Sequence, residues 1–163
     1  MERPSVHGAP NRGVGPATEP YLDEHGHISL PEGTNLSVML EKNVVDFADA
    51  LAYRYVDYSH DPDGKAIELT WDQVGTRSRA IAARLQQITS RGDRVAILAP
   101  QGLDYVTSFF GSIQAGNIAV PLFAPELPGH AERLDAVLTD ARPAVVLTTT
   151  AAGFFEHLVF RRI

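Results

Sequence analysis

The sequence predicts an α/β fold of the doubly wound type, in which a β-hairpin precedes a mostly parallel sheet. From residue 91 onward, short apolar runs typical of strands covered on both faces alternate with segments that have helical apolar spacing. Before them, partly alternating segments over 51–58 and 66–70 flank the turn-rich residues 61–64, which predicts the hairpin. Strand–helix–strand alternation indicates parallel strands joined by right-handed crossovers, and so a three-layer arrangement.

The helices are predicted from apolar residues that recur every three or four positions. Thr34 or Asn35 can cap the first helix, and Thr70 with Gln73 has the spacing of a capping box at the start of the second. Two further helices are expected before Gly116 and Pro143, which end them. The stripes of the first three helices are Leu36, Leu40, Val44, Phe47 and Leu51; Val74, Ser78, Ile81, Leu85 and Ile88; and Leu103, Val106, Phe110 and Ile113.

Three parallel strands are expected over 94–99, 118–122 and 144–148. The last of them is predicted to be an exposed sheet edge unless a further strand follows. Along the chain we expect a flexible Pro- and Gly-rich tail over 1–33, a folded region over 34–150 and a short C-terminal segment over 151–163.

Composition excludes several classes of function. The 163 residues carry a formal net charge of -6 with only two lysines, which argues against nucleic acid as a partner. The absence of cysteine excludes disulfides and thiolate catalysis and suits a reducing compartment, so a cytoplasmic location is predicted. No apolar stretch in the sequence is long enough to span a membrane or to form a signal peptide core.

Glycine and histidine motifs in the chain have plain structural explanations. Gly13 and Gly15 follow no strand, whereas a dinucleotide fingerprint requires one, and Gly64–Lys65 is explained by turn chemistry rather than by a phosphate loop. His25 and His27 could supply two metal ligands, but no third ligand stands at a supporting spacing, so no metal site is predicted.

Serine, aromatic and arginine side chains give weaker candidates. Ser112 follows a glycine but lies within a helical stripe, not on the strand-to-helix turn that a nucleophile requires. Arg133, close to His130, could face a ligand or lie on a solvated helix face. Six aromatic residues could line an apolar pocket for an acyl chain or pack in the core: Tyr53, Tyr55, Tyr58, Phe109, Phe110 and Phe123.

The segment from Leu69 to Pro121 resembles the adenylate-forming (AMP-binding) superfamily. Leu-Thr-Trp-Asp-Gln-Val over 69–74 resembles its first core motif, Gly-Asp-Arg-Val-Ala-Ile-Leu follows over 92–98, and the Ala115–Gly116 pair leads to a strand ending Val-Pro, as in the second core motif. Within that superfamily, five further segments resemble fatty acyl-AMP ligases most: 52–58, 84–87, 100–106, 123–130 and 146–150.

The resemblance implies the N-terminal part of a longer enzyme that activates a fatty acid. In that family, ATP and magnesium convert the fatty acid to an acyl-adenylate, and the acyl group passes to an acyl carrier protein or polyketide synthase. The family's phosphate loop, its later adenine-binding residues and its C-terminal lysine are not recognisable in the 163 residues. We therefore assign no catalytic, cofactor-binding or metal-binding residue to this chain and expect it to be inactive alone.

Three other interpretations of the sequence stay open. The chain could be a fragment of an acyl-CoA synthetase, since the insertion said to separate the two kinds of ligase lies beyond residue 163. It could also be a non-catalytic module that binds a lipid or associates with a full-length ligase, or an unstable remnant of a truncated gene.

Overall fold

The computed structural model describes residues 22–122, 130–149 and 158–162. The chain forms two compact units, one over residues 1–34 and the other over residues 35–163. In the described part of the first unit, an isolated bridge joins Leu22 to Ile28. The Asp23 carboxylate closes the turn between them by accepting hydrogen bonds from the backbone N–H groups of His25 (2.9 Å) and His27 (2.8 Å).

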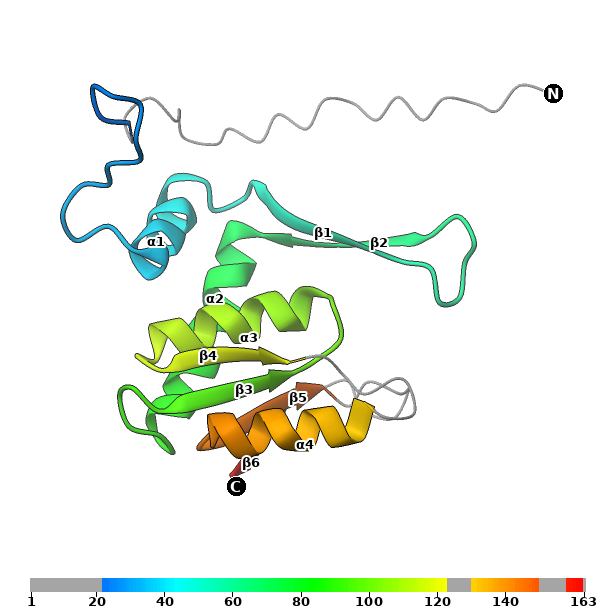
Figure 1. Ribbon diagram of the computed structural model, residues 1–163. Helices are drawn as coiled ribbons and strands as arrows, with labels where there is room; N and C mark the ends of the chain where they lie inside the picture. The colour runs from blue at the N-terminus through cyan, green and yellow to red at the C-terminus, as the bar shows by residue number, and fades with distance from the viewer. Residues whose placement is uncertain (1–21, 123–129, 150–157, 163) are drawn as a thin grey trace. The chain divides into compact units, whose positions relative to one another are not determined.

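The second unit contains four helices and six strands among its described residues (Figure 1). Their order confirms the predicted hairpin followed by strand–helix alternation. The elements are α1 (Leu36–Asp46), β1 (Leu51–Asp57), β2 (Lys65–Thr70), α2 (Trp71–Gln86), β3 (Arg94–Leu98), α3 (Leu103–Gln114), β4 (Ile118–Leu122), α4 (His130–Ala141), β5 (Val145–Thr149) and β6 (Leu158–Arg162).

The main sheet has the strand order β4-β3-β5-β6, with β3 parallel to both β4 and β5. The chain therefore crosses from β3 to β4 in one direction and from β4 to β5 in the other. Right-handed crossovers in opposite directions place their helices on opposite faces of a sheet. Figure 1 shows α2 and α3 along one face and α4 along the other, which confirms the predicted layered α/β architecture.

The third parallel strand is not an exposed edge, because the further strand that the prediction allowed for is present as β6, which pairs antiparallel with β5 along its free side. Among the described strands, β4 forms the opposite edge. The Ile118 N–H donates to the Asp93 carbonyl beside β3 (2.9 Å), so by alternation Ala119 and Pro121 direct their backbone groups outward. Proline has no N–H to donate, and this blunts the edge against the addition of a further strand.

The first helix is shorter than its apolar spacing predicted. It begins where the Asn35 side chain accepts a hydrogen bond from the Val38 N–H, as expected, but it ends at Asp46. Leu51, the last residue of the predicted stripe, instead begins β1. Helical spacing continues by chance into a segment whose β-branched and aromatic residues favour a strand.

Among the described residues, two hydrophobic clusters form the core. The first joins α1, the hairpin and α2 through Leu40, Val44, Leu69 and Val74, and the second joins α2 to the sheet through Leu85, Val95, Val145 and Leu147.

The buried face of α3 differs from the prediction. Its fully or nearly buried residues are small, namely Thr107, Ser108, Gly111 and Ser112, whereas the predicted apolar stripe is only partly buried. A Cβ atom at Gly111 would lie 2.7 Å from Cβ and Cγ2 of Ile81 and 2.9 Å from the Ser78 carbonyl oxygen. Small side chains are buried here because α2 and α3 approach closely.

This contact predicts that Gly111→Ala destabilises the fold. The added methyl group meets backbone and a β-branched side chain, neither of which can move away freely, so we expect a loss of about 1–3 kcal/mol in the free energy of unfolding. Gly102→Ala is the matched control, since a Cβ there would meet only the Pro100 carbonyl oxygen, at 4.0 Å. Equal urea midpoints for the two variants would contradict the close contact.

The capping box of α2 gives a second prediction. The Thr70 hydroxyl accepts from the Gln73 N–H (3.3 Å) while the Gln73 side chain accepts from the Thr70 N–H (3.0 Å). Thr70→Ala should lower the free energy of unfolding by about 1 kcal/mol. Thr70→Ser keeps the hydroxyl and should retain most of the stability, so an equal loss in both variants, measured by urea denaturation, would show that the cap contributes nothing.

Candidate functional site

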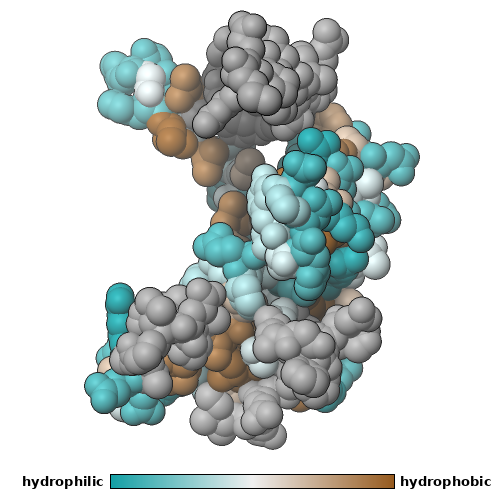
Figure 2. All heavy atoms as spheres, turned by 90° about the vertical axis from the view of Figure 1, so that its right-hand side faces the viewer, coloured by the Kyte–Doolittle hydropathy of each residue, from teal (hydrophilic) through white to brown (hydrophobic). Residues whose placement is uncertain are grey.

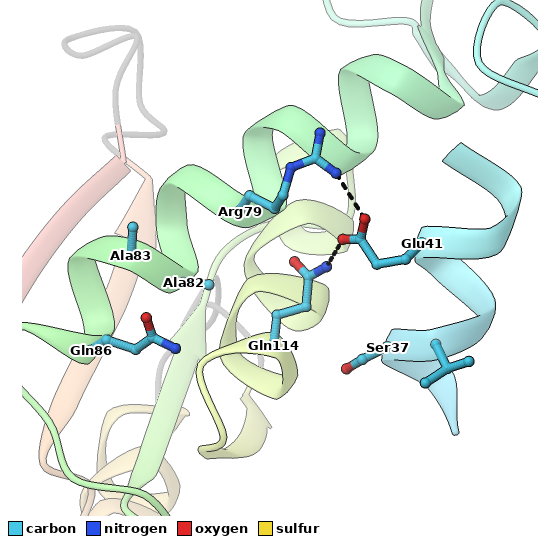
Figure 3. A pocket seen from close by; sticks show the side chains of 8 residues that line it. Ser37, Glu41, Arg79, Ala82, Ala83, Gln86 and Gln114 are labelled. Atoms are coloured by element: carbon cyan, nitrogen blue, oxygen red, sulfur yellow. Dashed lines mark hydrogen bonds and ion pairs between the residues drawn. The ribbon is translucent and has the colours of Figure 1, made fainter. Parts of the chain in front are cut away.

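An open groove of about 500 Å³ lies between α1, α2 and α3 (Figure 3). Small side chains on α2 leave this space between the three helices. Its lining residues are Ser37, Val38, Glu41, Arg79, Ala82, Ala83, Gln86 and Gln114. The volume lies in the range of small-molecule sites, so the polar groups in the groove decide what it can bind.

Glu41 on α1 joins all three helices. Its Oε2 accepts from Nη1 of Arg79 on α2 (3.0 Å), and its Oε1 accepts from Nε2 of Gln114 on α3 (2.6 Å). Figure 3 shows both side chains directed toward this carboxylate. The Glu41 and Arg79 side chains are about half exposed (44% and 46%), so solvent screens the ion pair and its contribution to stability is modest.

The groove does not fit the triphosphate and magnesium ion that the family resemblance implies. Its guanidinium, Arg79, is already paired with Glu41, and that carboxylate would repel a phosphate. The first turn of α1 offers N–H groups, but the Asn35 side chain occupies that of Val38. We therefore interpret the groove as a junction between helices and route no ATP chemistry through it.

The carboxyl ends of β3, β4 and β5 lie together at one end of the sheet, on the right-hand side of Figure 1. Doubly wound sheets bind ligands at the carboxyl ends of their strands, where successive connections leave toward opposite faces of the sheet. The connection after β3 is described and leads through Gly102 into α3. Residues 123–129 and 150–157, which follow β4 and β5, lie outside the described residues.

The aromatic residues do not converge on one pocket. Tyr53 packs edge to face on Trp71, beside the first core cluster, and burial raises the pKa of its phenol. Phe110 packs against the same cluster, whereas Tyr55 and Tyr58 lie exposed on the hairpin. Phe109 contacts only the edge of Phe110 among the described ring pairs, and Phe123 lies outside the described residues.

The other sequence candidates do not form a site among the described residues. Ser112 is fully buried and donates to the Ser108 carbonyl (2.8 Å), so it is not placed as a nucleophile. Gly64 closes the β1–β2 turn with a positive φ of 78°. Arg133 is exposed on α4, and the side chains of His25 and His27 are exposed in the first unit. Across the described residues, no three potential metal ligands come together.

Sequence reasoning missed the residues that line the groove. Glu41 is 38 positions from Arg79 and 73 from Gln114, and only the packing of three helices brings them together. Gln114 directly precedes the Ala115–Gly116 pair of the second core motif, whereas Glu41 and Arg79 stand in no recognisable motif, and no pattern in the sequence indicated that the three side chains meet.

The fold defines a class of mixed α/β proteins in which a hairpin precedes a mostly parallel sheet. Within that class the chain belongs to the AMP-binding enzyme family, whose pattern it matches over residues 40–159. This confirms the superfamily resemblance stated from the core motifs.

Individual relatives narrow the similarity further. The chain is 50% identical over 146 residues to the long-chain-fatty-acid–AMP ligase FadD32 of Mycolicibacterium smegmatis, a match that covers 90% of this chain and 23% of that relative. The fold is similar to that of a fatty acid AMP ligase from Legionella pneumophila, with a TM-score of 0.65 at 25% identity over 71% of this chain and 19% of that one. It is also similar to a Mycobacterium tuberculosis fatty acyl CoA synthetase, with a TM-score of 0.58 at 26% identity over 73% of this chain and 22% of that one.

These comparisons identify the chain as similar to the N-terminal part of fatty acyl-AMP ligases. The chain spans about a fifth of the length of the relatives that it matches. No helix in the described part of the chain is long and apolar enough to cross a bilayer.

The three-helix junction yields a prediction on stability. Glu41→Ala removes the acceptor for two side chains and should lower the free energy of unfolding by about 1–2 kcal/mol, most of it from the partly buried Gln114 bond. Glu41→Gln keeps an acceptor oxygen and should lose less than half as much. Urea denaturation of both variants checks this. A loss in Glu41→Gln as large as that in Glu41→Ala would show that charge, rather than hydrogen bonding, holds the junction.

Proposed function

We propose that this chain is the N-terminal portion of a fatty acyl-AMP ligase. In the proposed reaction, the fatty acid carboxylate attacks the α-phosphate of ATP to give acyl-adenylate and pyrophosphate. The phosphopantetheine thiol of an acyl carrier protein or polyketide synthase then attacks the acyl carbonyl, so that a thioester forms and AMP leaves, in lipid or polyketide biosynthesis in the cytoplasm. The observation that carries the proposal is the 50% identity to a long-chain-fatty-acid–AMP ligase over 146 residues.

The chemistry of the reaction indicates which part of the proposed ligase binds ATP. Acyl-adenylate formation requires donors, a cation and magnesium around the phosphates, because negative charge must be stabilised while the carboxylate approaches. The described groove does not offer this environment, since Arg79 is paired with Glu41. We propose that the ATP- and magnesium-binding residues belong to the part of the ligase fold beyond the matched region, and we assign no catalytic residue to this chain.

An acyl-CoA ligase portion is the second candidate function. Among solved structures, identity is 26% to the fatty acyl CoA synthetase and 25% to the fatty acid AMP ligase, and the chain is also 45% identical over 131 residues to a putative fatty-acid–CoA ligase of Mycobacterium tuberculosis. The 50% identity to the FadD32 ligase over 146 residues, against 45% to the putative CoA ligase, is the reason to prefer the acyl-AMP-forming reaction.

A chimera tests the proposal on the chemistry itself. We expect the purified chain alone to show no fatty-acid-dependent exchange of pyrophosphate into ATP. Substituting this chain's matched residues for those of the M. smegmatis relative should give an enzyme that retains exchange within about tenfold of its parent, because the two segments should position the remaining domain alike.

Two results would count against the proposal. Exchange by the chain alone would contradict the assignment of the ATP-binding residues to another part of the fold. A chimera that fails to fold or to exchange, beside an active parent enzyme, would contradict the claim that this chain is such a ligase portion.

A further inference from the structure

The β1–β2 hairpin has one apolar face that is only half covered. The register pairs Tyr53 with Leu69 and Tyr55 with Ile67, so these four side chains lie on the same face. At the inner end, Leu69 is 2% exposed and Tyr53 packs against the first core cluster. At the outer end, Tyr55 is 38% and Ile67 42% exposed. The apolar face therefore continues from the core out into solvent.

The opposite face of the hairpin carries the Arg54–Glu68 pair beside Val56 and Ala66, and the outer end and tip are polar. Arg54 and Glu68 face each other across the strands and form an ion pair with Nε to Oε1 at 2.5 Å. At the outer end, the backbone N–H of Ser59 donates to Asp57 and lowers the pKa of that carboxyl, which keeps it charged. Figure 2 looks onto the tip of the hairpin and shows a largely hydrophilic surface there.

A two-stranded ribbon with an uncovered apolar face is a marginal structure in water. Two strands alone bury too little surface for independent stability and need a further layer. In this hairpin, α1 and α2 supply that layer only at the inner end, around Leu40 and Val74. The Tyr55–Ile67 pair is the part of the same face that the described residues leave without a layer.

We propose that the Tyr55–Ile67 pair is a docking surface for the remainder of a fatty acyl-AMP ligase fold. The inference rests on the proposed function. The family match over 40–159 includes the hairpin, and the FadD32 relative carries this region within a chain of which it makes up only 23%. Most of such an enzyme therefore lies outside the unit described, and an apolar pair that extends the core gives it a surface to cover.

Other occupants fit less well. The outer end of the hairpin carries Asp57, Asp61 and Asp63 against the one cation Lys65, so its net charge is negative and an anionic membrane surface would be repelled. Addition of a strand to the β4 edge, the alternative way to dock an extended partner, is opposed by Pro121. Thiol labelling at different protein concentrations distinguishes a second copy of the chain from the rest of the ligase fold as the occupant.

Thiol labelling tests the docking surface, because the sequence contains no cysteine and a single introduced one is a unique reporter within it. Ile67→Cys places the thiol on the proposed surface, and Ala66→Cys places it one residue away on the opposite, exposed face. Each substitution is made in the chain alone and in the FadD32 chimera, and maleimide modification is followed by mass spectrometry of the peptide that carries it. We expect the thiol of the Ile67→Cys variant to react at least about tenfold more slowly in the chimera than in the chain, since a covered thiol is not attacked. The thiol of the Ala66→Cys variant should react at a similar rate in both.

The outcomes separate this inference from the proposed function. Equal reactivity at position 67 in an active chimera would contradict the docking surface alone. Protection at position 67 in a folded chimera without pyrophosphate exchange would support the docking surface and contradict the function. Protection in the chain alone that grows with its concentration would show that a second copy is the occupant and would overturn the inference, and a chimera that does not fold would contradict both.

Discussion

Close contact between α2 and α3 is the constraint on which the rest of the folded unit depends. Gly111 allows it, because a side chain there would collide with Ile81 and with the backbone of Ser78. Once the helices are together, α2 contributes Val74 to one core cluster and Leu85 to the other. The hairpin and the parallel sheet are thus held by opposite ends of a single helix. Loss of this contact would weaken both clusters, because Phe110 on α3 packs against the first and Ala115 at its end packs against the second.

Local interactions explain which parts of this fold could be predicted from the sequence. The capping box at Thr70, the buried strand of β3 and the turn at Gly64 depend on neighbouring residues, and each lies where the residue pattern indicated. The small-residue face of α3 could not be found in this way, because hydrophobicity identifies apolar stripes and not close helix contacts. The pairing of β6 with β5 also depends on tertiary contacts, so it could not be predicted from neighbouring residues either.

The candidate functional site could likewise be predicted from the sequence only in part. The core motifs within 69–121 were sufficient to indicate the AMP-binding family, to which the chain belongs. By contrast, Glu41, Arg79 and Gln114 lie far apart in sequence, and no motif indicates that their side chains meet. In the structure they hold three helices together, and Arg79 offsets the charge of Glu41, so the groove between them is a structural junction. The chemistry of the proposed ligase requires groups that this junction lacks.

Pyrophosphate exchange by two chimeras tests the central claim most directly. This chain's matched segment is placed once in the M. smegmatis FadD32 ligase and once in the M. tuberculosis fatty acyl CoA synthetase, and each is compared with its parent. The account predicts that fatty-acid-dependent exchange, relative to the parent, is at least about tenfold higher in the ligase chimera, since contacts between the segment and the remaining fold should match there. Equal retention in both, or higher retention in the synthetase chimera, would contradict the assignment of this chain to a fatty acyl-AMP ligase.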